Sequence, residues 1–159
     1  MKDAISNAVV IQIIIIFLVI INSYLAFSVN YTRAFRIKNN IVSTIERYEG
    51  LTREAHNQIE EMMANAGYSI SDSYLTKCGA SGYEVIRNSN GTGGFCAKIS
   101  IVGNAAGEYQ GTYYSVVTYV NIDLPFLNKI LPVFANAFAI KGETKTILSS
   151  GTGTELRLD

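Results

Sequence analysis

The sequence has little of the residues that catalytic and metal sites use. Its 159 residues contain no tryptophan, one histidine and two cysteines. A structural zinc site needs four ligands, which three such residues do not supply. His56 lies on the polar side of an expected helix with Glu60 four residues later, which indicates a surface pair rather than a general base in a cleft. We therefore predict no enzymatic activity, no metal and no cofactor.

An excess of charge of one sign is also missing. The chain has 13 basic and 13 acidic side chains, and no basic stripe with interleaved aromatic residues, so we predict no nucleic-acid partner. The two prolines, Pro125 and Pro132, come late, and no glycine precedes Gly50. The first 49 residues therefore contain neither of the residue types that interrupt a helix.

One long hydrophobic run is present, AVVIQIIIIFLVIINSYLAFSV, at residues 8–29. At 1.5 Å per residue its helix covers about 33 Å, enough to cross a hydrocarbon core of about 30 Å. A secretory signal has a shorter run and small residues at a cleavage site, whereas here the chain continues as SVNY. We therefore predict a single membrane-spanning helix.

Two amides interrupt this run and are candidate helix–helix contacts. Gln12 and Asn22 are polar groups in a lipid environment, where a hydrogen bond to another helix is favourable. The alternative is that Asn22 lies near the wet interface and that Gln12 snorkels to it.

The helix is expected to continue beyond the span as an amphipathic helix. Apolar residues recur at spacings of three and four up to residue 48, with polar residues on the other side. The stripe is Ala34, Ile37, Ile41, Ile45 and Tyr48. We assign Ile37, Ile41 and Ile45 to helix packing.

Orientation and cysteine state are linked. Lys2 precedes the span and Arg33, Arg36 and Lys38 follow it, so the positive-inside rule places the C-terminal part in the cytoplasm. Cys78 and Cys96 favour the opposite orientation, because a disulfide forms in an oxidising compartment. We predict a bridge and an exported domain; two buried free thiols are the alternative.

The rest of the chain predicts a second helix followed by a sheet. The helix is expected between Thr52 and Gly67, and a polar loop from Tyr68 to Gly82. Its apolar face is expected to be Leu51, Ala55, Ile59, Met62 and Ala66. Alternating apolar residues predict antiparallel strands at 83–87, 95–101 and 113–124, and a fourth that includes Phe134, Phe138 and Ile140.

These elements define an α+β fold. A long N-terminal helix, half transmembrane and half amphipathic, and a second helix are expected to cover a four-stranded antiparallel sheet. We divide the chain into the helix at 1–49, an exported α+β domain at 50–148 and a flexible tail at 149–159.

Tyrosine is abundant, with ten residues in the chain. Tyr113 and Tyr119 fall on the less apolar face of their strand and are candidate surface contacts, because tyrosine offers a large contact area at low entropic cost. The alternative is that they are present for their high strand propensity.

The order of elements resembles type IV pilin-like subunits, and more narrowly the TadE-like minor pseudopilins of tight-adherence pilus systems. The residues that carry the resemblance are NYTRAFRIKNNIVSTIERYEG after the span and the closing strands VVTYVNIDLPF and FAIKGETKTI. The family pattern also has a glycine before a processing site and a glutamate near the fifth position of the mature helix. This sequence has no acidic residue between Asp3 and Glu46.

The resemblance implies a structural subunit that contributes to filament assembly and surface adhesion. Its partners would be the membrane, other pilin or pseudopilin subunits and assembly-platform proteins, in a homo- or hetero-oligomer. The alternative is a single-pass membrane-anchored extracytoplasmic binding or secretion-complex module that does not enter a filament. Both place the chain in the cell membrane with its C-terminal domain outside the cytoplasm, and the first adds a surface filament.

Overall fold

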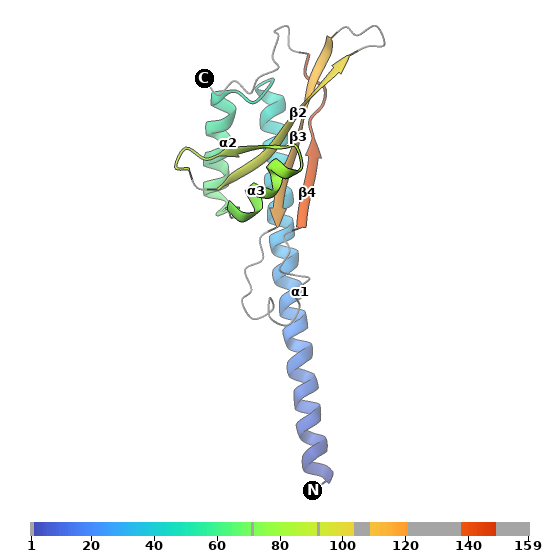
Figure 1. Ribbon diagram of the computed structural model, residues 1–159. Coiled ribbons are helices and arrows are strands. Elements are labelled where there is room, and N and C mark those ends of the chain that lie inside the picture. The colour runs from blue at the N-terminus through green and yellow to red at the C-terminus, as the bar shows by residue number, and fades with distance from the viewer. Residues whose placement is uncertain (1, 71, 92, 104–108, 121–137, 149–159) are drawn as a thin grey trace.

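The computed structural model describes residues 2–70, 72–91, 93–103, 109–120 and 138–148. In this part of the chain, three helices precede four strands (Figure 1). The elements are α1 (Lys2–Arg47), α2 (Arg53–Asn65), α3 (Asp72–Ala80), β1 (Glu84–Arg87), β2 (Gly94–Gly103), β3 (Tyr109–Val120) and β4 (Phe138–Glu143). The strands form one antiparallel sheet in the order β1-β2-β3-β4. The predicted α+β fold with a long N-terminal apolar helix, a second helix and a four-stranded sheet is confirmed.

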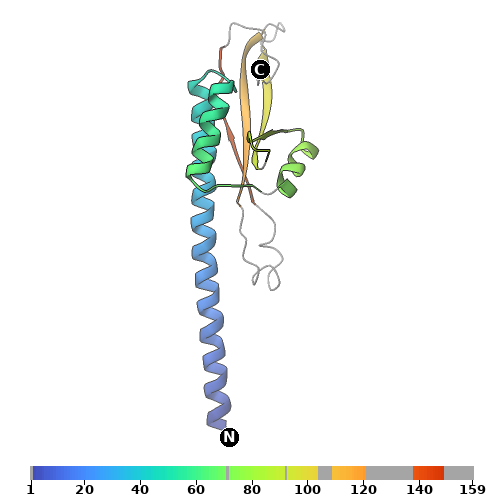
Figure 2. The ribbon, with the colours of Figure 1, turned by 90° about the vertical axis from the view of Figure 1, so that its left-hand side faces the viewer.

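Helix α1 is continuous over 46 residues, as the absence of glycine and proline before Gly50 predicts. Its N-terminal half projects from the rest of the fold, and its C-terminal half lies against the sheet (Figures 1 and 2). The most deeply buried residues of the second half, each at most 2% exposed, are Ala34, Ile37, Ile41 and Ile45. The chain turns at Glu49 and Gly50, which have φ angles of 53° and 147°.

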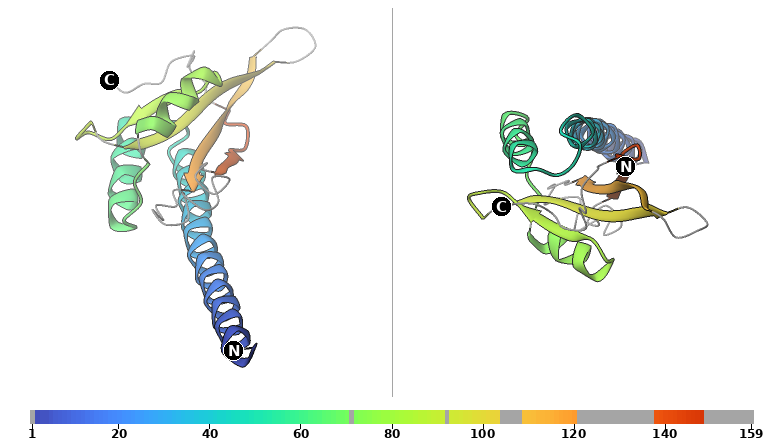
Figure 3. Two further views of the ribbon diagram at one scale, coloured as in Figure 1. Left: turned by 60° about the horizontal axis from the view of Figure 1, so that its bottom comes forward. Right: turned by 90° about the horizontal axis from the view of Figure 1, so that it is seen from above.

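Helix α2 lies beside α1 on the same face of the sheet and runs in the opposite direction (Figures 2 and 3). Thr52 is its N-cap, and the Thr52 hydroxyl oxygen accepts a hydrogen bond from the Ala55 backbone N–H at 3.2 Å. The buried residues are Ala55, Ile59 and Met63. The expected face is shifted: a strict spacing of four puts Met63 in the core, Met62 is half-buried and packs against the core, and Ala66, expected on this face, is exposed.

Helix α3 corrects the prediction of a polar loop between Tyr68 and Gly82. Nine residues of this segment are helical, and they cover the face of the sheet opposite α1 and α2 (Figures 2 and 3). Leu75 and Cys78, three residues apart, are buried at 0% and 1% exposure. The sheet is therefore enclosed by helices on both faces rather than on one.

The strand register places alternate β3 residues on the two faces. Cys96 pairs with Val117 at one end of the β2–β3 ladder, and Thr118 pairs with Ile140 of β4. The Thr118 hydroxyl donates to the Ala34 carbonyl oxygen at 3.3 Å, so the even-numbered positions of β3 face α1. The expected continuation of β3 to residue 124, the start of the last strand at residue 134 and the tail at 149–159 lie outside the described residues.

Candidate functional site

The N-terminal half of α1 carries a large apolar surface. Within the described residues, it forms the one helix that is long and apolar enough to cross a membrane, with a mean hydropathy of 2.6 over its most apolar window. Ile13 and Phe17 are 60% and 61% exposed in the isolated chain. Moving an apolar side chain of this size out of water is favourable by about 1.5–3 kcal/mol relative to leaving it exposed. This surface is therefore the candidate membrane-spanning surface of the chain.

Four polar side chains in and after the apolar run, Asn22, Ser23, Asn30 and Thr32, donate hydrogen bonds within their own helix. Asn22 Nδ2 donates to the Leu18 carbonyl oxygen at 2.7 Å, and the Ser23 hydroxyl donates to the Val19 carbonyl oxygen at 2.6 Å. Such i to i−4 bonds lower the cost of placing these groups in lipid. Gln12 is exposed on the helix surface. Helix–helix contact through Gln12 and Asn22 stays a prediction.

An aromatic ladder lies where α1 meets the domain. We define it as Phe27, Tyr31 and Phe35 of α1 with Phe138 of β4. Neighbouring ring centroids along α1 are 6.1 and 6.5 Å apart, and the Phe27 and Phe138 rings meet edge to face at 5.5 Å. Aromatic rings concentrate at membrane–water interfaces. The spacing of four in the sequence was a signal for this ladder, which sequence reasoning missed.

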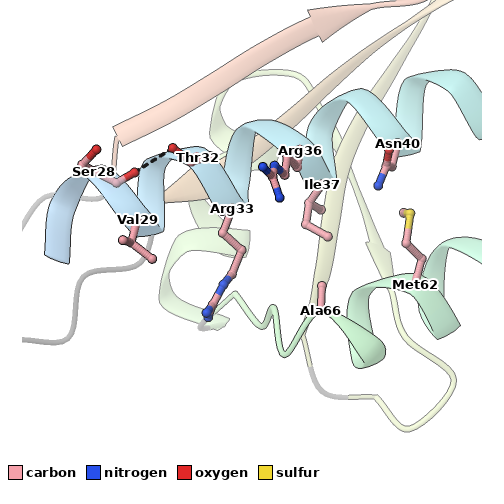
Figure 4. Close-up of a pocket in the computed structure, with 9 residues that line it drawn as sticks. All are labelled: Ser28, Val29, Thr32, Arg33, Arg36, Ile37, Asn40, Met62 and Ala66. Atoms are coloured by element: carbon pink, nitrogen blue, oxygen red, sulfur yellow. Dashed lines mark hydrogen bonds between the residues drawn. The ribbon is translucent and has the colours of Figure 1, made fainter. Parts of the chain in front are cut away.

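A groove of about 510 Å³ opens between α1 and the C-terminal end of α2 (Figure 4). Figure 4 shows Arg33 and Ile37 projecting from α1 toward the side on which Met62 and Ala66 of α2 lie. The lining residues are Ser28, Val29, Thr32, Arg33, Arg36, Ile37, Asn40, Met62 and Ala66. None of these nine is acidic. The groove thus combines two guanidinium groups with an apolar wall.

His56 and Glu60 hold the β1–β2 turn rather than each other. His56 Nε2 lies 2.9 Å from the Arg87 carbonyl oxygen, which can only accept, so Nε2 carries the proton. The Ser89 backbone N–H donates to both Glu60 carboxylate oxygens at 3.1 Å, and the Ser89 hydroxyl donates to one of them. The Ser89 hydroxyl is the main cause of a lowered Glu60 pKa, and desolvation opposes it. The sequence-based His56–Glu60 pair is replaced by two contacts from α2 to the turn.

The predicted disulfide is present and joins α3 to β2. Cys78 and Cys96 are bonded, with their Cα atoms 6.0 Å apart. The bridge therefore attaches the short helix α3 to the sheet. Among the described residues, no group of three or more histidine, cysteine or acidic side chains is arranged to hold a metal ion.

The two candidate surface tyrosines differ in position. Tyr119 is 9% exposed, stacks on Tyr74 of α3 at 5.8 Å between centroids, and has its hydroxyl 3.9 Å from Cys78 Sγ. The predicted surface position of Tyr119 is therefore wrong, because α3 covers that face. Tyr113 is half-buried, and its role as a surface contact stays a prediction.

A buried tyrosine that sequence reasoning did not single out connects the α2–α3 segment to β3. The Tyr68 hydroxyl donates to the Tyr119 carbonyl oxygen at 2.6 Å and accepts from the Tyr119 N–H at 3.0 Å. Burial raises the pKa of Tyr68, so the hydroxyl stays protonated and available as a donor.

Comparison of the chain with protein-family models, curated proteins and solved structures gives no match. The functional assignment therefore depends on the long apolar helix and the domain fixed to it.

Proposed function

We propose that this protein is a pilin-like structural subunit, close in kind to the TadE-like minor pseudopilins of tight-adherence pili. The observation that carries the proposal is α1 itself. One uninterrupted helix of 46 residues supplies an exposed apolar half and a half that is part of the domain core. A subunit that bundles its N-terminal helices and displays a folded domain needs both halves in a single rigid element.

Contacts from the sheet to α1 support this rigidity. Thr118 of β3 donates to the Ala34 carbonyl oxygen, and the Phe138 ring of β4 contacts the Phe27 ring seven residues nearer the N-terminus. The domain is thus attached to α1 at the end of the span, without a linker between them. A module that only needs an anchor gains nothing from this arrangement, because a flexible connection would serve it equally well.

The proposed mechanism uses the same apolar surface twice. In the bilayer, lipid covers the exposed side chains of residues 9–25, and in a filament the helices of neighbouring subunits cover them. We place the domain outside the cytoplasm, where the Cys78–Cys96 bridge is stable. Other pilin or pseudopilin subunits and an assembly platform are the partners that this mechanism requires.

A second candidate is a membrane-anchored extracytoplasmic module that stays in the bilayer. The observation that favours it is the lack of an acidic residue between Asp3 and Glu46 and of a glycine before Gly50. The family pattern uses such residues for processing and for pairing with a neighbouring N-terminus. Without them, retention in the membrane needs no further explanation.

Shearing the producing cells separates the two candidates. We expect the full chain in the sheared filament fraction, and we expect it to leave that fraction when the assembly ATPase is deleted. An integral membrane protein unrelated to the filament serves as the control and must stay in the cell pellet. Retention of the chain with that control, under conditions in which filaments are recovered, would exclude the filament subunit and leave the anchored module.

A further inference from the structure

Among the described residues that line the groove between α1 and α2, positive charge has no negative counterpart. Arg33 and Arg36 both line it, none of the other lining residues is acidic, and the described residues provide no hydrogen bond or ion pair to either guanidinium. Asn40 adds an amide, and Ser28 adds a hydroxyl. Guanidinium groups bind phosphate through two parallel hydrogen bonds, so two of them in one groove form a favourable phosphate site.

The groove lies at the depth where lipid headgroups begin. The apolar run of the sequence starts at Ala8, and Ser28 is the first residue of the groove along α1. The 20 steps between them span about 30 Å of helix, close to the thickness of the hydrocarbon core. The aromatic ladder, which starts at Phe27, marks the same level. A bilayer that covers the span thus ends where the two arginines begin.

The rest of the lining suits the upper end of an acyl chain. Val29 and Ile37 of α1 and Met62 of α2 give the groove an apolar wall beside the arginines. A free inorganic anion would use only the guanidinium groups. A phospholipid would use both the charged and the apolar parts.

We propose that this groove binds the headgroup phosphate of an anionic phospholipid, with Arg33 and Arg36 as its ligands. The proposal goes beyond the structural role argued above, since it needs only that the span lies in a bilayer and not that the chain enters a filament. It also gives the cations after the span a function that is independent of membrane orientation.

Lipid retention by the full chain tests the proposal. The protein is purified in mild detergent micelles that contain equal amounts of phosphatidylglycerol and phosphatidylcholine, and the co-purifying lipid is measured after size exclusion. We expect about one phosphatidylglycerol per chain. Each basic residue near an anionic surface contributes about a fivefold preference, so Arg33→Gln with Arg36→Gln predicts a loss of roughly 25-fold. Arg53→Gln, an exposed arginine at the other end of α2, is the matched control and should retain the lipid.

A second variant tests the groove rather than its charge. Ala66→Phe fills the groove at an exposed C-cap position with φ −78°, which any L-residue adopts, and leaves both arginines in place. We expect it to lose the lipid as well. The proposal is overturned if wild type shows no preference for phosphatidylglycerol, or if both variants retain it. It is also overturned if millimolar inorganic phosphate displaces the lipid, which would identify a free anion as the ligand.

Discussion

The Tyr68 hydroxyl lies beside β3 at Tyr119, just beyond the last β3 residue that pairs with β2. The β2–β3 register ends with Cys96 opposite Val117, so the backbone N–H and carbonyl of Tyr119 find no partner in β2. The Tyr68 hydroxyl alone satisfies both groups: it donates to the carbonyl oxygen at 2.6 Å and accepts from the N–H at 3.0 Å. Tyr68→Phe keeps the ring and removes both bonds. Leaving a buried polar group unpaired costs about 1–3 kcal/mol, so two such groups predict a loss of about 3 kcal/mol in the free energy of unfolding.

Pulse proteolysis in urea, applied to the full chain in detergent micelles, measures this loss in the domain without requiring α1 to unfold. Tyr109→Phe is the matched control. It also removes a hydroxyl, which lies 2.8 Å from Thr112 Oγ1, but Tyr109 is 45% exposed and water can replace the bond. We expect the control to change stability by less than about 0.5 kcal/mol. If Tyr68→Phe is no more destabilising than Tyr109→Phe, the two backbone groups do not depend on the hydroxyl.

Three further perturbations follow from the same packing. Replacing Cys78 and Cys96 by serine removes a bridge between residues 18 positions apart and should lower the free energy of unfolding in urea by about 3 kcal/mol. Intact mass before and after reduction checks that the bridge is present in the wild-type protein. Gly94→Ala should cost at least about 2 kcal/mol, because Gly94 has a φ of 139° and a Cβ there would overlap a backbone carbonyl oxygen of β1; Gly91→Ala, with a φ of 75° and open space around it, should cost only about 1 kcal/mol in the same assay. Ionised Glu60 stabilises the fold, since its pKa in the folded state lies below its ordinary value of 4.5. In a pH series of unfolding curves, Glu60→Gln should therefore lower the free energy of unfolding by less than about 1 kcal/mol, and this disadvantage should be present above pH 4.5 and disappear as the pH falls through the folded pKa. A disadvantage that grows toward low pH would contradict this sign.

Long periodic segments were the predictable part of the fold. The absence of glycine and proline before Gly50 and the stripe from Ala34 to Ile45 were sufficient for α1, because backbone continuity and amphipathic spacing are local properties. Thr52 identified the start of α2 for the same reason, since its hydroxyl caps a backbone N–H only three residues away.

Helix α3 was not predictable in this way. It has nine residues, and only Leu75 and Cys78 among its described residues are buried. An isolated helix of this length is marginal, so its stability comes from the sheet beneath it and from the bridge to Cys96. Whether Tyr119 is a surface or a core residue depended on this helix, which is why the strand pattern alone placed it wrongly.

The groove depends on two elements that meet only in the folded chain. Arg33 and Arg36 of α1 could be read from the sequence as charges after a candidate span, but Met62 and Ala66 close the groove because α2 runs back along α1 toward the N-terminal half of α1 (Figure 2). That direction follows from the tight turn at Glu49 and Gly50. No local pattern in either helix specifies the distance between them.

The cations after the span also bear on membrane orientation. Lys38 has a role in packing: its side chain lies over Gly142 of β4, where a Cβ would overlap Lys38 Cδ, and its ammonium group is 4.5 Å from the Phe35 ring centroid. Arg33 and Arg36 line the groove. The positive-inside rule counts such residues as topology signals because Lys and Arg are in excess in cytoplasmic loops. Lys38 thus has a position that the fold explains, and Arg33 and Arg36 have one that the proposed lipid would explain, so the number of cations is a weak guide to the side on which the domain lies. The disulfide is the stronger guide, because its persistence depends directly on the redox conditions of the compartment.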